Sequence, residues 1–308
     1  MSNRTRLAMT TRAETFERVR DPLAERGIDV GHVRAKERSI RVAGGEDSSE
    51  GDDPAEERGV VSTLDTGFDV GFVYPSRLME GAVVDAHLSV PWVNGRDAVV
   101  TSRNKAGVLT TLEAAGVPVP QTTLVSNPVD ESVVLEAVDE FEFPVVVKPN
   151  SATRGVGVAK ATDPDSLLGI VDYLNLVHDY RATGDKSYLI QEFLPDASDY
   201  RVMIVDGEYA GAVRRELPAD ALSEGRWKHN VHRGAEATGV TLATAGQELA
   251  ERAAAALDID YLGVDLLESN GRLVVNETNA RPTVDAATKY EPGFYDRLAA
   301  LVERVAEE

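Results

Sequence analysis

The stretch GVDLLESNGRLVVNETN, residues 263–279, decides the fold, because it predicts a β-hairpin with acidic side chains set among apolar ones. The hairpin turns either over the three residues 270–272 or over the two residues Asn270-Gly271. Alternation along a strand places Glu277 and Asn279 on one face of the sheet. Asp265 lies on the other strand of the hairpin, where the turn decides which residue it opposes.

The length of the turn therefore decides whether Asp265 joins that face. A three-residue loop, 270–272, pairs Asp265 with Glu277, whereas a two-residue turn brings Asn276 opposite Asp265 and spoils the site. Carboxylates are rarely buried unpaired, so three converging oxygen side chains require a cation. Hard oxygen ligands suit Mg²⁺ that is shared with substrate phosphates. We interpret Asp265, Glu277 and Asn279 as metal ligands rather than as parts of a structural hairpin.

A second motif, VVVKPNSATRGVGVAKA at residues 145–161, predicts a buried strand that delivers Lys148 to a glycine-containing turn. Backbone N–H groups in such a turn can face an anion, and glycine lets the chain approach phosphates closely. The motif is neither GxxxxGK[ST] nor GxGxxG, because no helix follows it. Alone it is more typical of plain structure than of a binding site.

A third motif is LIQEFLPDASDYRVMIV, residues 189–205. Residues 191–194 can offer backbone groups and an aromatic edge to an adenine, and Asp199 can accept hydrogen bonds from ribose hydroxyls. A strand that leaves the core with solvated charges explains the same pattern, and for this motif alone that explanation is favoured.

Two cationic segments stand out in an acidic chain. Arg214 and Arg215 are neighbours on a predicted strand, so their side chains point to opposite faces and at most one faces a common site. The segment RWKHNVHRGA, 226–235, concentrates polar and cationic groups, and against the acidic background it indicates a bound anion. Those groups are Lys228, His229, Asn230, His232 and Arg233.

Composition excludes several classes of protein. Of the 308 residues 43% are hydrophobic and 27% are charged, which excludes disordered and fibrous chains. A net charge of −20 argues against nucleic-acid and membrane-surface binding. The absence of cysteine excludes disulfides, thiolate metal sites and a cysteine nucleophile. No apolar run approaches the roughly 18 residues of a membrane helix, so we expect a cytoplasmic protein. The small number of lysines, seven, suggests a salt-loving source.

The order of predicted elements indicates two kinds of domain. Residues 1–100 read as a small α/β domain, with an acidic stretch at 46–58 that we expect to be a mobile loop. After residue 101 come a helix at 102–116 with a serine start, a hairpin at Asp206-Gly207 and a final helix at 293–306. The pattern indicates an α+β nucleotide-binding unit behind the smaller α/β domain.

Taken in order, these motifs resemble the ATP-grasp superfamily and, within it, the RimK-type α-L-glutamate ligases. The resemblance covers roughly residues 70–290 and rests on RNK, VVVKP with its glycine-rich loop, QEF, DYRVMIV, VRR, WKHNVHRGA, GVDLL and NETN. It implies an ATP-grasp fold, α/β with α+β, in which two α+β subdomains clamp ATP. The subdomains would be 101–186, with the flap, and 187–308, with the Mg²⁺ site, preceded by a pre-ATP-grasp domain at 1–100.

The resemblance also implies residue roles. One of Arg214 and Arg215 meets the transferring phosphoryl group, and Asp265, Glu277 and Asn279 bind Mg²⁺. The implied ATP-binding residues are Lys105, Lys148, Ser151, Arg154, Gly155, Gly157, Gln191, Glu192, Phe193, Leu194, Asp199, Lys228, His229 and Asn230. The implied substrate-binding residues are Arg201, His232, Arg233 and Arg281.

The implied reaction joins a carboxylate to an amine with ATP and Mg²⁺, through an acylphosphate and with release of ADP. Two Mg²⁺ ions are expected, with Mn²⁺ as a substitute. The expected partners are a small-molecule or peptide carboxylate acceptor and an amino acid, L-glutamate, with no nucleic acid and no membrane. Relatives often form dimers or tetramers, so a homo-oligomer is also expected. In NARPTVD, Arg281 and Thr283 stand where relatives carry small residues; Arg281 either binds a substrate carboxylate or pairs with a surface acid.

Two other functions remain open from the sequence. The first keeps the scaffold but changes the product, as in a glutathione-synthase-like enzyme, a dipeptide ligase or a ligase that acts on a carrier protein. The second is a non-catalytic ATP-binding regulator. The intact set Asp265, Glu277 and Asn279 argues against a regulator, because a protein that only binds ATP does not need a full metal set.

Overall fold

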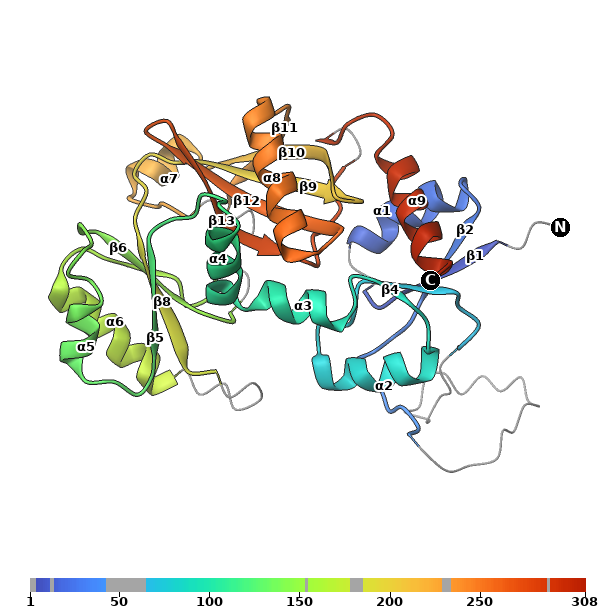
Figure 1. Cartoon of the computed structure of the whole chain (residues 1–308), viewed down its shortest axis with the longest axis horizontal. Helices are drawn as coiled ribbons and strands as arrows, with labels where there is room; N and C mark the ends of the chain where they lie inside the picture. The colour runs from blue at the N-terminus through green and yellow to red at the C-terminus, as the bar shows by residue number, and fades with distance from the viewer. Residues whose placement is uncertain are drawn as a thin grey trace. The chain divides into compact units, whose positions relative to one another are not determined.

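The computed structural model describes residues 4–11, 14–42, 65–152, 155–177, 185–228, 234–286 and 289–308. The chain, coloured by residue number in Figure 1, divides into two compact units. Unit 1 consists of Met1–Val99, Arg281–Ala287 and Pro292–Glu308, and unit 2 of Val100–Ala280 and Thr288–Glu291. The acidic stretch 46–58 lies outside the described residues.

Unit 1 contains a parallel four-stranded sheet in the order β2-β1-β3-β4. Parallel strands need helical crossovers, which agrees with the expected α/β class. Its elements are β1 (Thr5–Met9), α1 (Glu14–Ala24), β2 (Ile28–His32), β3 (Val70–Phe72), α2 (Leu78–Leu88), β4 (Trp92–Val93) and α9 (Phe294–Ala306).

The final helix belongs to this first unit, although the sequence analysis grouped residues 187–308 in one subdomain. Helix α9 is amphipathic and buries one face, which includes Leu298, Leu301 and Val302. That face contacts β1, β3 and β4 of the parallel sheet. The chain therefore returns to its first unit to cover apolar surface there, and sequence order alone does not reveal such a return.

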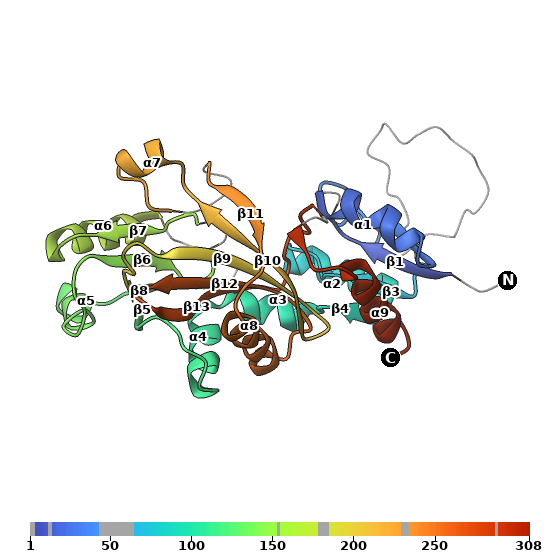
Figure 2. The ribbon, with the colours of Figure 1, turned by 90° about the horizontal axis from the view of Figure 1, so that it is seen from above.

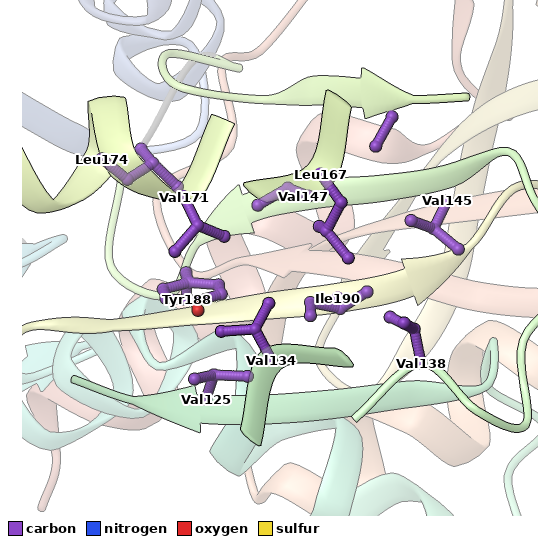
Figure 3. Packing of buried hydrophobic residues seen from close by; sticks show 11 residues of the cluster. Val125, Val134, Val138, Val145, Val147, Leu167, Val171, Leu174, Tyr188 and Ile190 are labelled. Carbon is purple, nitrogen blue, oxygen red and sulfur yellow. The ribbon is translucent and has the colours of Figure 1, made fainter. Parts of the chain in front are cut away.

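Unit 2 contains a four-stranded antiparallel sheet in the order β5-β8-β6-β7. Its apolar face forms a core in which Val147, Ile190 and Leu167 are fully buried (Figure 3). Helix α6 supplies Leu167, and α5 supplies Val134 to the same core. The elements are β5 (Thr122–Ser126), α5 (Glu131–Glu136), β6 (Val145–Pro149), β7 (Ala159–Ala161), α6 (Pro164–Val177) and β8 (Ser187–Glu192).

The second sheet of unit 2 is antiparallel, with five strands in the order β11-β10-β9-β12-β13. Figure 2 shows α4 and α8 on the same side of this sheet, and both helices contact its strands. The other face of the sheet is thus available for polar side chains. The elements are α4 (Lys105–Ala114), β9 (Ser198–Val205), β10 (Glu208–Glu216), α7 (Ala219–Ser223), β11 (Glu236–Val240), α8 (Thr244–Leu257), β12 (Tyr261–Ser269) and β13 (Arg272–Asn279).

Turn and cap chemistry explains several boundaries. The hairpin turn at Asp206-Gly207 is confirmed, with φ of 57° and 74° at its two central residues. The serine start expected for the helix at 102–116 is wrong. Residues Arg96–Arg103 form a separate helix, α3, and α4 begins after Asn104, whose side chain accepts a hydrogen bond from the Gly107 N–H at 3.0 Å. Within the described residues, no helix combines the length and the apolar character that crossing a membrane requires.

Candidate active site

A β-bulge sets the register of the acidic hairpin formed by β12 and β13. The turn has only two residues, Asn270-Gly271, so a regular ladder would place Asn276 opposite Asp265. The ladder shifts by one residue at Asn276, and Asp265 pairs with Glu277 instead. The expected pairing of Asp265 with Glu277 is confirmed, but the three-residue loop from which it was derived is wrong.

Four charged side chains meet on one face of the five-stranded sheet. Arg201 on β9 is the direct neighbour of Asp265 on β12, and Asp199 on β9 is the neighbour of Arg215 on β10. Arg201 donates from Nε and Nη2 to the two oxygens of Asp265, each at 2.7 Å. Arg215 donates to Asp199 at 2.5 Å and lies 3.1 Å from Asp265. Period-two alternation produces this cluster, because all four side chains occupy same-face positions.

The cluster perturbs the acidity of its own members. Burial alone would raise the pKa of Asp265, but Arg201 and Arg215 outweigh burial and hold the pKa well below its ordinary value. Burial raises the pKa of Asp199 to about 6, against the opposing charge of Arg215. A buried ion pair seldom stabilises a protein more than apolar side chains of the same size would, so stability alone does not explain this cluster. Side chains with shifted pKa values that gather in a cleft are typical of a functional site.

Two buried lysines stand near this face. Lys105 Nζ lies 3.3 Å from Glu277 and also donates to the carbonyl oxygen of Ala152. Lys148 donates to Gln191 Oε1 at 2.9 Å and is 3.4 Å from the Asn276 side chain. Burial lowers the pKa of Lys148 to about 8, although the charge of Glu277 opposes the shift.

The glycine-rich turn after β6 has the geometry that glycine permits. Gly155 and Gly157 have φ of 66° and 74°, and a Cβ on Gly157 would lie 2.7 Å from Pro149. Neither position therefore tolerates an L side chain without strain. The hydroxyl oxygen of Ser151 is buried and has no hydrogen-bond partner among the described residues. Arg154 lies outside the described residues.

A cavity of about 700 Å³ lies within unit 2, and its wall includes residues of the acidic cluster, Lys148 and the glycine-rich turn. This volume is typical of a small-molecule or cofactor site. Of the residues that the sequence analysis singled out, the cavity is lined by Lys148, Gly155, Gln191, Glu192, Phe193, Leu194, Asp199, Arg214, Arg215, Lys228, Asp265 and Glu277.

The remaining expected site residues do not line this cavity or are not described. Lys105, Ser151, Gly157, Arg201 and Asn279 are not in its wall. Arg281 belongs to unit 1, where it donates to the carbonyl oxygens of Val73 and Tyr74. His229, Asn230, His232 and Arg233 lie outside the described residues.

Two of the lining side chains bond within the protein in ways that the sequence did not indicate. The carboxylate of Glu192 accepts hydrogen bonds from the Gln121 N–H at 2.6 Å and from Arg272 at 2.9 Å. Arg214 lies 3.1 Å from Glu216 and 3.4 Å from Ser198. Of the two neighbouring arginines, Arg215 is therefore the one that joins the acidic cluster.

Phe193 and Lys228, which were expected at the nucleotide site, belong to an aromatic and cationic cluster in the cavity wall together with Lys160 and Trp227, which were not expected there. The rings of Phe193 and Trp227 meet edge to face with centroids 5.8 Å apart. Lys160 Nζ lies 4.8 Å from the Phe193 centroid, and Lys228 Nζ lies 5.4 Å from that of Trp227. These distances allow cation–π attraction. The scarcity of lysine in the chain was the signal that could have drawn attention to Lys160.

The oxygen donors on the hairpin suit a hard divalent cation. Asp265 and Glu277 are paired across the two strands, and alternation places Asn279 on the same face as Glu277. Two carboxylates and an amide oxygen are ligands that Mg²⁺ accepts, with phosphate oxygens and water to complete its shell. Across the described ranges, no group of three His, Cys, Asp or Glu side chains is placed to hold a metal ion.

Comparison with known proteins first identifies the class of fold. A solved RimK domain ATP-grasp protein from Sphaerobacter thermophilus superposes with a TM-score of 0.64 over 97% of this chain and 100% of its own, at 20% identity. The chain therefore has the ATP-grasp fold, which confirms the fold class expected from the motifs.

The family follows from the sequence match. A model of the RimK-like ATP-grasp domain matches residues 102–292. The chain belongs to the RimK-like ATP-grasp family and thereby to the ATP-grasp ligases. The resemblance stated from the motifs is confirmed.

Curated relatives carry ligase names. A probable alpha-L-glutamate ligase from Mannheimia succiniciproducens is 29% identical over 214 residues, 68% of this chain and 67% of that protein. The ribosomal protein bS6--L-glutamate ligase of Escherichia coli is 28% identical over 199 residues, 64% of this chain and 62% of that protein. The second match thus spans less than two thirds of the relative's own length.

Proposed function

We propose that this protein uses ATP to join the carboxylate of an acceptor to the amine of L-glutamate, with release of ADP and phosphate. The observation that carries the proposal is the cavity of about 700 Å³, whose wall combines Lys148 and Lys228 with the carboxylates of Asp265 and Glu277. Cations beside a pair of metal-binding carboxylates suit a nucleotide triphosphate with its divalent ion. The ligase names of the relatives support the choice of reaction.

The two ends of the cavity suit different parts of the nucleotide. Phe193, Leu194 and Trp227 supply apolar and aromatic surface for a purine base. Lys148 and the glycine turn at Gly155 supply a positive charge and backbone N–H groups for phosphates. Lys105 is expected to assist through its contact with Glu277.

In the first step, a carboxylate oxygen of the acceptor attacks the γ-phosphorus of ATP. The bond from that phosphorus to the ADP oxygen breaks, and an acylphosphate forms. We assign Arg215 to the transferring phosphoryl group, because its guanidinium lies 3.1 Å from Asp265 at the metal-binding end of the cavity. A fixed cation at this place stabilises the negative charge that spreads over the phosphoryl oxygens.

In the second step, the glutamate amine attacks the carbonyl carbon of the acylphosphate. Phosphate leaves with the electrons of the broken C–O bond, the amine loses a proton to solvent, and an amide remains. Asp265, Glu277 and Asn279 would hold Mg²⁺, which supplies Lewis-acid neutralisation of the phosphate charge when bound. Arg201, His232, Arg233 and Arg281 stay candidate substrate-binding residues, and His229 and Asn230 stay candidate ATP-binding residues.

The acceptor class is also part of the proposal. One relative is named for the transfer of L-glutamate to a ribosomal protein, so a peptide carboxylate is the first acceptor to test. A net charge of −20 favours an acceptor that carries basic residues near its reacting carboxylate.

The reaction is tested by mass spectrometry of products together with ADP release in high-salt buffer. With ATP, Mg²⁺, L-glutamate and a panel of carboxylate acceptors, we expect ADP release and a mass gain of one or more glutamyl units on one acceptor. ADP release with another amine would retain the ligase and exclude glutamate. Tight ATP binding without ADP release from any pair would contradict the proposed ligation and favour an ATP-binding regulator.

Nucleotide affinity should fall as the pH rises through about 8, by up to about tenfold per pH unit. Burial lowers the pKa of Lys148 to about 8, so the free protein loses this positive charge above that pH. Phosphates beside Lys148 would raise its pKa, so binding takes up a proton there. Trp227 fluorescence in Trp92→Phe protein, which keeps only one tryptophan, measures ATP affinity. Lys148→Met should bind weakly at every pH. An equal affinity of the parent at about pH 7 and about pH 9 would contradict the role of Lys148.

A further inference from the structure

Arg201 forms a bidentate ion pair with Asp265, the proposed metal ligand. Its Nε and Nη2 donate to the two oxygens of Asp265, both at 2.7 Å. The two residues are direct neighbours on the adjacent strands β9 and β12, so the ladder itself fixes their separation. A planar guanidinium fork bound to both oxygens of a carboxylate sets its orientation as well as its position.

A second arginine reaches the same carboxylate. Arg215 Nη2 lies 3.1 Å from Oδ2 of Asp265, so three arginine N–H groups occupy this one carboxylate. A carboxylate offers about four lone-pair positions. A divalent cation that approaches Asp265 by itself therefore meets one remaining position and two neighbouring positive charges.

We propose that Arg201 is a positioning residue that keeps Asp265 as the counter-ion of an arginine pair, so that the divalent ion binds together with the nucleotide and not before it. The inference rests on the proposed role of Asp265 as a metal ligand. Phosphate oxygens bring the negative charge that offsets Arg201 and Arg215, and they supply ligands to the ion. Arg215 is then drawn toward the phosphates, while the Arg201 fork keeps the carboxylate of Asp265 in its plane.

The chain contains a matched control for this idea. Arg214 carries the same charge as Arg201 and neighbours Arg215, but it lines the cavity and its ion pair is with Glu216 at 3.1 Å. Removal of either Arg214 or Arg201 changes the net charge of the protein by the same amount. Only the loss of Arg201 removes the bidentate hydrogen bonds to Asp265.

The test is a titration of the full chain with Mn²⁺ in the absence of nucleotide, followed by electron paramagnetic resonance of the free ion. We expect weak binding to the parent protein and at least about a tenfold higher affinity in Arg201→Met, because one of two repelling charges is gone. Arg214→Met should stay within about threefold of the parent. The gain should vanish in the double variant R201M/D265N, which also measures non-specific binding to the acidic surface.

An unchanged Mn²⁺ affinity in Arg201→Met, or an equal gain in Arg214→Met, would overturn the inference. If circular dichroism shows that Arg201→Met is unfolded, Arg201→Gln replaces it, since glutamine is neutral and retains an N–H donor for Asp265; the same gain is expected. A second titration adds a non-hydrolysable ATP analogue. If Asp265→Asn binds Mn²⁺ with the analogue as tightly as the parent does, the metal assignment in the proposed function fails, whatever Arg201 does.

Discussion

Glu277→Gln is expected to lower the rate of Mg²⁺-dependent ADP release by about a hundredfold to a thousandfold while the fold is retained. Glu277 pairs with Asp265 across the hairpin and faces Lys105 at 3.3 Å. Glutamine has nearly the same shape but lacks the negative charge by which a carboxylate ligand stabilises a divalent cation. Steady-state ADP release over a range of Mg²⁺ concentrations measures the loss, and circular dichroism checks the fold.

Glu268→Gln is the matched control for this change. Glu268 lies on the same hairpin but is exposed, with a contact to the Tyr200 hydroxyl at 3.3 Å and none to the cavity. It should leave ADP release within about twofold of the parent, as expected for a surface site. Parent-like turnover in Glu277→Gln would remove Glu277 from the metal site.

Arg215→Met is expected to lower kcat by about a hundredfold or more, with a smaller effect on the KM for ATP. Arg215 is nearly buried, bonded to Asp199 at 2.5 Å and 3.1 Å from Asp265, so its guanidinium lies beside the proposed metal-binding carboxylate. A cation that acts on charge developing in the transition state affects kcat more than ground-state binding. Initial rates over a range of ATP concentrations separate the two parameters.

Arg214→Met serves as the comparison, because Arg214 pairs with Glu216 and not with the acidic cluster. We expect less than a tenfold loss of kcat in this variant. A larger loss in Arg214→Met than in Arg215→Met would reverse the assignment and place Arg214 beside the transferring group. Arg215→Lys should recover part of the activity if the positive charge is what matters, although lysine lacks the fork that bonds to Asp199.

The local chemistry of the chain was largely readable from the sequence. Asp206-Gly207 forms the hairpin turn that such a pair favours, because both central residues have positive φ, whereas Asn270-Gly271 forms a two-residue turn in place of the expected three-residue loop. Alternation along the strands explains why only Arg215 of the two neighbouring arginines joins the acidic cluster, although both arginines line the cavity. The motifs in their order were also enough to indicate the family. Each motif is a short run of residues, so it can be recognised without knowledge of the tertiary structure.

What only the tertiary structure decided were the pairings between distant segments. The bulge at Asn276 gives Asp265 its partner, and nothing in the local pattern distinguishes that bulge from a regular ladder. The return of α9 to the first unit follows from apolar surface that needed cover. The ion pair between Arg201 and Asp265 forms because β9 and β12 are neighbours in the sheet, although Arg201 and Asp265 are 64 residues apart in the sequence. Turns and alternation are properties of adjacent residues, whereas burial and ion pairing depend on which strands the whole chain brings together.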